Sequence, residues 1–174
     1  MCIRDRDLAQ MAGWLAAAAA IIAMLQKSDL RLKQGLIIHT VLYGIHFALL
    51  GLPTAVVSCV IALARITLSI YTRSLLCAAA LIISAAMALA LSRSTVDILP
   101  LAASVVLTLS LFRFDGIKLR LGLLAGSILW LIHNVYVQSW GGICLETCFC
   151  LSTLWGLWTM VREQNEKPKK EICL

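Results

Sequence analysis

Six residues of types suited to binding a polar molecule lie inside otherwise apolar stretches of this sequence. Glu146 is the strongest candidate, because an ionisable side chain is costly inside a membrane and marks a functional site by default. Its carboxylate could face a water-filled cavity, pair with an imidazole or take part in proton coupling, but so near the end of an apolar run it could also reach headgroup water. The six residues form the candidate solute site: Tyr43, His46, Trp130, His133, Asn134 and Glu146.

The aromatic and imidazole groups of this site recur at helical spacing, so that they form two stripes at the same depth. Imidazoles can donate to a sugar-like hydroxyl or carry a proton, and the amide of Asn134 both donates and accepts hydrogen bonds. The alternative is that these groups only hydrogen-bond neighbouring helices. One stripe contains His39, Tyr43 and His46, and the other contains Gly126, Trp130 and His133.

Arg65 is another charged residue within a predicted span. It lies eight residues before Arg73, on the half of its span nearer the basic flank, so its long side chain could snorkel to the interface as an anchor. The other interpretation is an inner gate. The repeat described below does not place Arg65 opposite Glu146, and we predict no ion pair between them.

The seven cysteines give no signal for a metal or redox centre. None forms a C-x-x-C pair, and Cys144 and Cys148, although four residues apart on one helix face, fit small packing residues between membrane helices. The sequence therefore predicts no metal and no cofactor.

The elements that position these residues must be membrane helices. The chain has 174 residues, of which 61% are hydrophobic and 14% charged, more apolar surface than a soluble domain of this size can bury. Its mean hydropathy of +0.91 excludes a water-soluble monomer. We predict an all-α polytopic membrane protein with seven apolar spans, at about 8–25, 36–52, 55–72, 75–92, 97–112, 119–137 and 142–160.

The distribution of Lys and Arg predicts the orientation of the spans. The predicted cytoplasmic flanks hold 11 of these residues and the other side holds Arg4, Arg6 and Arg93, which places the N-terminus in the periplasm and the C-terminus in the cytoplasm. The net charge of +6 is then explained by topology and anionic lipid headgroups, not by nucleic acid. The 11 are Lys27, Arg31, Lys33, Arg73, Arg113, Lys118, Arg120, Arg162, Lys167, Lys169 and Lys170.

A weak internal repeat relates the two halves of the chain at an offset of 87 residues. Ile45-His46 falls on Ile132-His133, and residues 32–46 match their counterparts at six of fifteen positions. We therefore predict two parallel three-helix repeats, 8–72 and 97–160, joined by a linker helix in 73–96 and followed by a cytoplasmic tail, 161–174. This plan is similar to that of the SWEET sugar transporters. Residues 1–7 are expected to be non-native or disordered, because Met-Cys-Ile-Arg-Asp-Arg resembles translated adapter sequence.

Several short segments match a known family in order and spacing over residues 8–160. They include His46-Phe47-Ala48-Leu49-Leu50-Gly51, Thr72-Arg73-Ser74-Leu75 and Trp130-Leu131-Ile132-His133-Asn134. With these segments the chain resembles the YgjV-like family of bacterial inner membrane proteins. The sequence departs from that family at Ala62 and Thr153, where the family has Asn, so a site built on those amides is not expected here. The resemblance implies an architecture and a compartment and names no substrate.

These observations favour a secondary transporter or facilitator of a small polar solute, with one site between the two repeats. The alternative is a non-transporting scaffold or assembly protein whose polar residues serve helix packing. An enzyme is not expected, because H-E-x-x-H, G-x-S-x-G and phosphate-binding glycine loops are missing from the sequence. The predicted partners are the lipid bilayer and the solute, and association into a homo-oligomer is left open.

Overall fold

The structure, a computed structural model of the chain, is described for residues 3–51, 53–90, 98–136, 138 and 140–171. These residues form seven α-helices and contain no strand, which confirms the predicted all-helical class. The helices are α1 (Ile3–Met24), α2 (Asp29–Leu49), α3 (Pro53–Tyr71), α4 (Leu75–Ala90), α5 (Ile98–Arg113), α6 (Gly116–Tyr136) and α7 (Trp140–Glu171).

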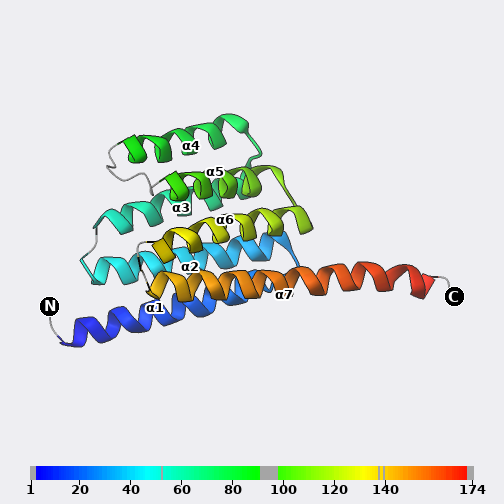
Figure 1. Cartoon of the computed structure of the whole chain (residues 1–174), viewed down its shortest axis with the longest axis horizontal. Helices are drawn as coiled ribbons and strands as arrows, with labels where there is room; N and C mark the ends of the chain where they lie inside the picture. Colours follow the sequence, from blue (N-terminus) through cyan, green and yellow to red (C-terminus); the bar gives the residue numbers. More distant parts are fainter. Residues whose placement is uncertain (1–2, 52, 91–97, 137, 139, 172–174) are drawn as a thin grey trace.

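The helices lie side by side and alternate in direction (Figure 1). Helices α1, α3 and α5 finish at one end of the bundle, and α7 runs past that end; α2, α4 and α6 run the opposite way. We call the first end the basic end, because Lys33 and Arg120 lie there, and the other end, where α2 and α6 finish, the far end. Helix α4 packs against α3 and α5 at the edge of the bundle.

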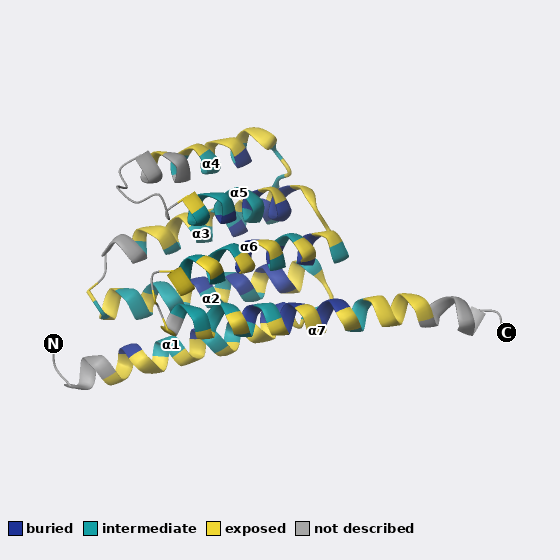
Figure 2. Cartoon of the chain, in the orientation of Figure 1, coloured by how far each residue is buried: buried dark blue, intermediate teal, exposed yellow. Residues whose placement is uncertain are grey.

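Three helices are long and apolar enough to cross a membrane, over Asp7–Met24, Gly116–Tyr136 and Gly142–Asn165. The shorter apolar helices among the described residues cover Val56–Tyr71, Leu75–Ser84 and Ile98–Arg113. Most helices expose part of their surface on the outside of the bundle (Figure 2), and many of the exposed residues are large and hydrophobic. Trp14 and Leu76, for example, are 76% and 83% exposed, which suits contact with lipid.

Several helices are longer than the apolar runs that predict them. Helix α1 begins at Ile3, within the segment expected to be non-native or disordered, α2 begins at Asp29 instead of residue 36, and α7 continues to Glu171. The physical reason is that an apolar run marks the part of a helix in the membrane, whereas charged residues can extend the same helix into water. Arg93 and the end of the predicted linker lie outside the described residues.

The offset of 87 residues recurs in the bounds of the helices. Helices α2 and α6 have 21 residues each, and they begin and end 87 positions apart, at Asp29 and Gly116 and at Leu49 and Tyr136. Helices α3 and α7 also begin 87 positions apart.

The same offset recurs in two close helix contacts. Gly35 of α2 lies against Ala23 of α1, where an added Cβ would be 2.6 Å from the Ala23 Cβ. Gly122 of α6, 87 residues later, lies against Ser110 of α5, where an added Cβ would overlap the serine side chain. Ser110 is itself 87 residues after Ala23. A missing side chain therefore lets α2 approach α1, and α6 approach α5, at corresponding positions.

Candidate functional site

On α2 the aromatic stripe of the candidate solute site is continuous. The Tyr43 ring lies between two imidazoles, with centroids 5.4 Å from His39 and 5.8 Å from His46, and it is nearly parallel to the His46 ring. Tyr43 lies six residues from the end of its helix, a depth of roughly 9 Å at a rise of about 1.5 Å per residue. The predicted stripe thus exists as a stack of rings.

His46 is directed toward α1 of its own half. Its Nδ1–H donates to the carbonyl oxygen of Ala9 at 2.7 Å, and Gly13 leaves room for the ring, since a Cβ there would lie 3.1 Å from Nδ1. His39 bonds Ala16 in the same way at 2.9 Å. Both α2 imidazoles therefore tie two helices together, as the packing interpretation of these residues expects.

On α6 the corresponding stripe has an imidazole nitrogen without a partner. Trp130 and His133 meet edge to face, with centroids 5.7 Å apart. The buried Nδ1 of His133 has no hydrogen-bond partner among the described residues, unlike the same atom of His46. Asn134 is turned toward the start of α7, where its amide lies directly over Gly142.

Glu146 lies on α7, six residues after Trp140, at the depth of Tyr43 and Trp130. Its carboxylate lies near the Ser127 side chain of α6. The buried Oε2 atom has no hydrogen-bond partner within the described part of the chain. A buried carboxylate oxygen and a buried ring nitrogen thus remain unpartnered on the neighbouring helices α6 and α7.

The two halves meet at this depth through α2 and α7. Glu146 is within electrostatic range of Tyr43, and the His39 ring meets Phe149 edge to face at 5.5 Å. The structure therefore brings Tyr43 toward Glu146 and Trp130 against His133, whereas His46 is held against α1.

Arg65 joins two helices from different halves. Its Nη1 donates to Ser104 Oγ of α5 at 3.1 Å, while its buried Nε has no partner among the described residues. This contact is compatible with either predicted role, a gate or an anchor, and it directs the guanidinium toward a neighbouring helix.

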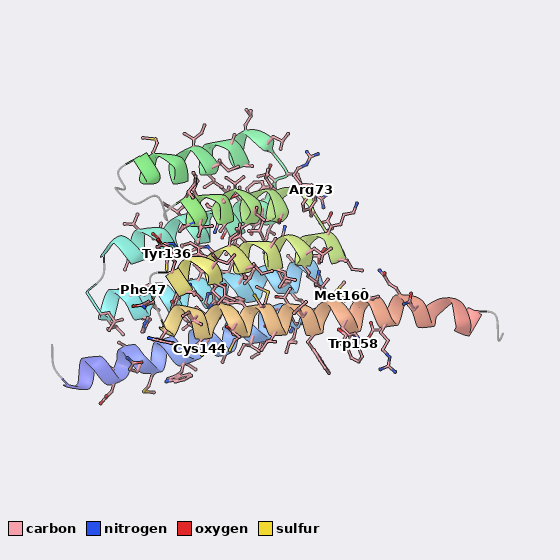
Figure 3. The ribbon with its side chains drawn as sticks, in the orientation of Figure 1. Phe47, Arg73, Tyr136, Cys144, Trp158 and Met160 are labelled. Carbon is pink, nitrogen blue, oxygen red and sulfur yellow. The ribbon has the colours of Figure 1, made fainter. Side chains whose placement is uncertain are left out.

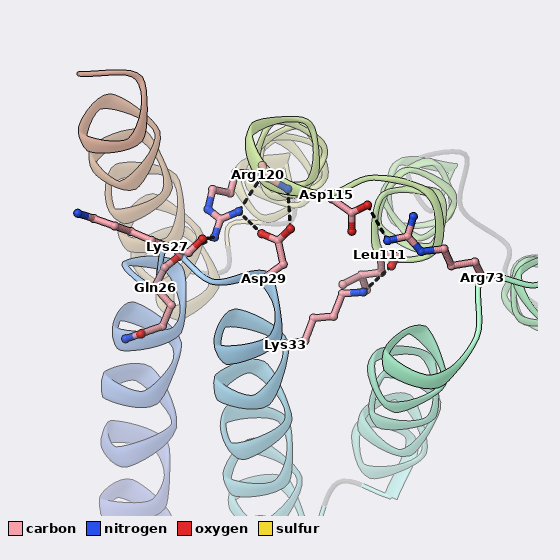
Figure 4. Close-up of polar contacts among 9 residues, drawn as sticks. Gln26, Lys27, Asp29, Lys33, Arg73, Leu111, Asp115 and Arg120 are labelled. Atoms are coloured by element: carbon pink, nitrogen blue, oxygen red, sulfur yellow. Dashed lines mark hydrogen bonds and ion pairs between the residues drawn. The ribbon is translucent and has the colours of Figure 1, made fainter. Parts of the chain in front are cut away.

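Sequence analysis missed a charged cluster at the basic end, shown in Figure 4. Arg120 of α6 is fully buried and pairs with Asp29 of α2 at 2.5 Å. Asp29 also accepts a 2.6 Å hydrogen bond from the backbone N–H of Gly116, where α6 begins with a positive φ of 57°. We call this group the inner cluster; its members are Asp29, Lys33, Arg73, Asp115 and Arg120.

Lys33 of α2 lies beside a cavity in this cluster. Its Nζ donates to the carbonyl oxygens of Ser69 at 2.9 Å and Leu111 at 2.8 Å. The cavity has a volume of about 290 Å³. It is lined by Asp29, Leu30, Lys33, Ser69, Ile70, Tyr71, Thr72, Arg73 and Asp115.

Two further ion pairs at the basic end are exposed to solvent. Arg73 pairs with Asp115 at 2.6 Å, and Lys27 pairs with Glu163 of α7. Figure 3 shows Arg73 at this end, and Phe47, Tyr136 and Cys144 at the far end. At the repeat offset of 87 residues Lys33 corresponds to Arg120, which is the signal in the sequence that could have indicated this cluster.

Comparison with known proteins agrees with a membrane location. A family model described as bacterial inner membrane protein matches residues 7–164. The chain is similar to inner membrane protein YgjV of Escherichia coli (strain K12), with 30% identity over 145 residues that cover 83% of this chain and 79% of that protein. No solved structure matches the chain.

Proposed function

Because the chain belongs to the YgjV family of bacterial inner membrane proteins, we propose that it is a secondary transporter or facilitator of a small polar solute. The single observation that carries this proposal is the pair of unpartnered atoms in the candidate solute site, Glu146 Oε2 and His133 Nδ1. A buried polar atom without a partner costs free energy, and more so away from water, so a structural role alone does not explain two of them on the neighbouring helices α6 and α7. A bound solute with hydroxyl or amide groups would satisfy both.

The neighbouring residues suit a neutral polar solute. Tyr43 and Trp130 offer aromatic faces at the same depth, and Asn134 offers a donor and an acceptor. We propose that Glu146 contacts the solute directly and, in a coupled transporter, carries the proton. Transport of this kind involves no covalent step.

The recurrence of the offset of 87 in helix bounds and glycine contacts supports two parallel halves around this site. In this proposal residues 8–72 and 97–160 rock against each other about the solute, with the linker helix outside the moving interface. This proposal requires that the two units superimpose at the offset of 87 residues without inversion of either unit.

The test is a thermal-stability screen of the purified full chain in detergent against monosaccharides, polyols and amino acids. We expect at least one of these solutes to raise the melting temperature of the wild type and of Thr147→Val, an exposed neighbour on α7. Glu146→Gln keeps the shape and removes the charge, so the same solute should stabilise this variant much less. When uptake of a stabilising solute into proteoliposomes is measured, the rate for Glu146→Gln should no longer depend on pH.

A scaffold or assembly role is the second candidate, favoured by the hydrogen bond of His46 to α1. It predicts that no solute in the panel stabilises the protein and that Glu146→Leu raises stability by removing an unsatisfied polar group. That result would reject the transporter.

We also propose that the basic end faces the cytoplasm and the N-terminus the periplasm. In intact cells, an impermeant thiol reagent should label Gln138→Cys at the far end but not Gln164→Cys, beyond the basic end on α7. Both positions are exposed. The opposite labelling pattern would reverse the orientation without affecting the solute site.

A further inference from the structure

The basic end gathers the C-terminal ends of α1, α3 and α5, and α7 passes through it (Figure 1). The last carbonyl groups of a helix have no intrahelical partner, and together they carry a partial negative charge. A cation placed among such ends can hydrogen-bond to these oxygens and hold the helices together.

Lys33 makes such a connection between the two halves. From the first turns of α2 its Nζ reaches Ser69, near the end of α3 in the same half, and Leu111, near the end of α5 in the other half. The side chain is buried, and the ammonium group therefore depends on these carbonyls.

Arg120 makes the corresponding connection from the second half. Its Nη2 donates to the carbonyl oxygens of Gln26 and Lys27, just after α1 ends, at 2.7 and 2.8 Å. Its Nη1 donates to Asp29 and to the Gly116 carbonyl. Arg120 lies 87 residues after Lys33, so corresponding cations from α2 and α6 each cross to the opposite half.

The two connections differ in how firmly they are held. Arg120 is fully buried and pairs with a carboxylate, whereas Lys33 has two neutral acceptors and borders the cavity of about 290 Å³. Water in that cavity can replace the carbonyls around the Lys33 ammonium, whereas the Arg120 side chain is itself fully buried, although its partner Asp29 also lines the cavity.

We propose that Lys33 and Arg120 close the solute path at the basic end, with Arg120 as a fixed connection and Lys33 as the latch that releases into the cavity. The inference rests on the proposed transport function and assigns the gate of the same path. Lys33 and Arg120 act on the position of helices α3, α5 and α1, and neither contacts the candidate solute site.

The test measures access to the protein interior behind the latch. Ile66 of α3 is buried, one turn before Ser69, and Ile66→Cys places a thiol there. The full chain in lipid nanodiscs is treated with a positively charged, water-soluble methanethiosulfonate reagent, and labelling is followed by peptide mass spectrometry. Adding Lys33→Gln should raise the labelling rate of this thiol about tenfold, the effect on a two-state opening expected from losing hydrogen bonds to a charged group.

Matched controls separate opening from general loosening. Arg31→Gln removes an exposed positive charge two residues away and should leave the labelling rate unchanged, and Lys33→Arg should keep the rate near that of the wild type. Ala78→Cys, buried in α4, should stay unreactive in the Lys33→Gln background. An unchanged rate at residue 66, an equal rise with Arg31→Gln, or an equal rise at residue 78 would each overturn the latch.

The latch and the transport function fail in different ways, because this labelling needs no solute. A selective rise at residue 66 in a protein that no solute stabilises would keep the Lys33 latch and reject transport. Glu146-dependent stabilisation by a solute, without that rise, would keep transport and reject Lys33 as the gate.

Discussion

The basic end and the far end of the bundle differ in how the terminal atoms of their buried polar side chains are partnered, although the buried Nε of Arg120 also has no partner among the described residues. At the basic end, Lys33 and Arg120 direct their terminal nitrogens to carbonyl or carboxylate oxygens of the other half. Toward the far end, Glu146 Oε2 and His133 Nδ1 have no partner among the described residues. Buried charges that are hydrogen-bonded stabilise one arrangement of the helices, whereas unpartnered polar atoms remain available to bind a ligand.

This difference suggests that the two ends of the bundle have different roles. In the proposed transporter, the side chains that connect the halves at the basic end need not change when the candidate solute site opens to the far side. Movement that opens the basic end must first break the bonds of Lys33 or Arg120. The quantity to measure is therefore the change in the free energy of unfolding when each of these groups is removed.

The largest expected effect is the loss of Arg120. Arg120→Gln removes the charge that pairs with Asp29 and leaves that carboxylate, which is 25% exposed, with the hydrogen bond from the Gly116 N–H. Breaking one side of a buried ion pair costs about 3 kcal/mol or more, so we expect a loss of this size in the free energy of unfolding. Denaturation of the full chain in mixed dodecylmaltoside and sodium dodecyl sulfate micelles measures it.

Arg31→Gln is the matched control, since Arg31 is exposed in the same turn of α2 as Lys33. Its effect should stay within about 0.5 kcal/mol of the wild type. If Arg120→Gln costs no more than this control, the inner cluster does not hold the halves together.

The next effect concerns the close contacts at Gly35 and Gly122. A Cβ at Gly35 would lie 2.6 Å from that of Ala23, so Gly35→Ala should destabilise the protein by about 1–3 kcal/mol through overpacking. Gly122→Ala should do the same through Ser110, because the repeat places it in the same contact. The same micelle titration applies to both.

Gly44 supplies the control for this pair. A Cβ there would lie at an ordinary 3.5 Å from the Cys59 Cβ, so Gly44→Ala should be neutral, or stabilising by up to about 1 kcal/mol through helix propensity. A similar loss at all three glycines would mean that close approach is not what distinguishes Gly35 and Gly122.

Much of the fold could be predicted because a membrane helix needs only length and apolarity. The runs near 55–72 and 119–137 correspond closely to α3 and α6. The helix ends were predicted less well, as at α2 and α7, because a charged segment can continue a helix or leave it with little change in hydropathy.

The site was predicted less completely than the fold, because spacing fixes the face of a helix and not what that face meets. Tyr43 and His46 share a face as expected, yet the bond from His46 to Ala9 depends on how closely α1 approaches at Gly13. Lys33 was counted as a topological charge, since a sequence does not show which carbonyl oxygens its ammonium will reach. The correspondence of Lys33 with Arg120 at the repeat offset is the one feature of the sequence that indicates a shared role for these two cations.

The smallest expected effect comes from Arg73, which sharpens the comparison within the basic end. Arg73 and Asp115 form an ion pair at 2.6 Å, but their side chains are 68% and 53% exposed, so water and salt screen their attraction. Arg73→Gln should therefore lower the free energy of unfolding by about 0.2–1 kcal/mol, and less at high ionic strength. The same denaturation series at about 0.01 M and 1 M salt measures this dependence. If the loss in the free energy of unfolding equalled that of Arg120→Gln and did not change with salt, the exposed rim of the cavity would hold the halves together as strongly as the buried cations do. In that case burial would not distinguish the fixed connection at Arg120 from the releasable latch at Lys33.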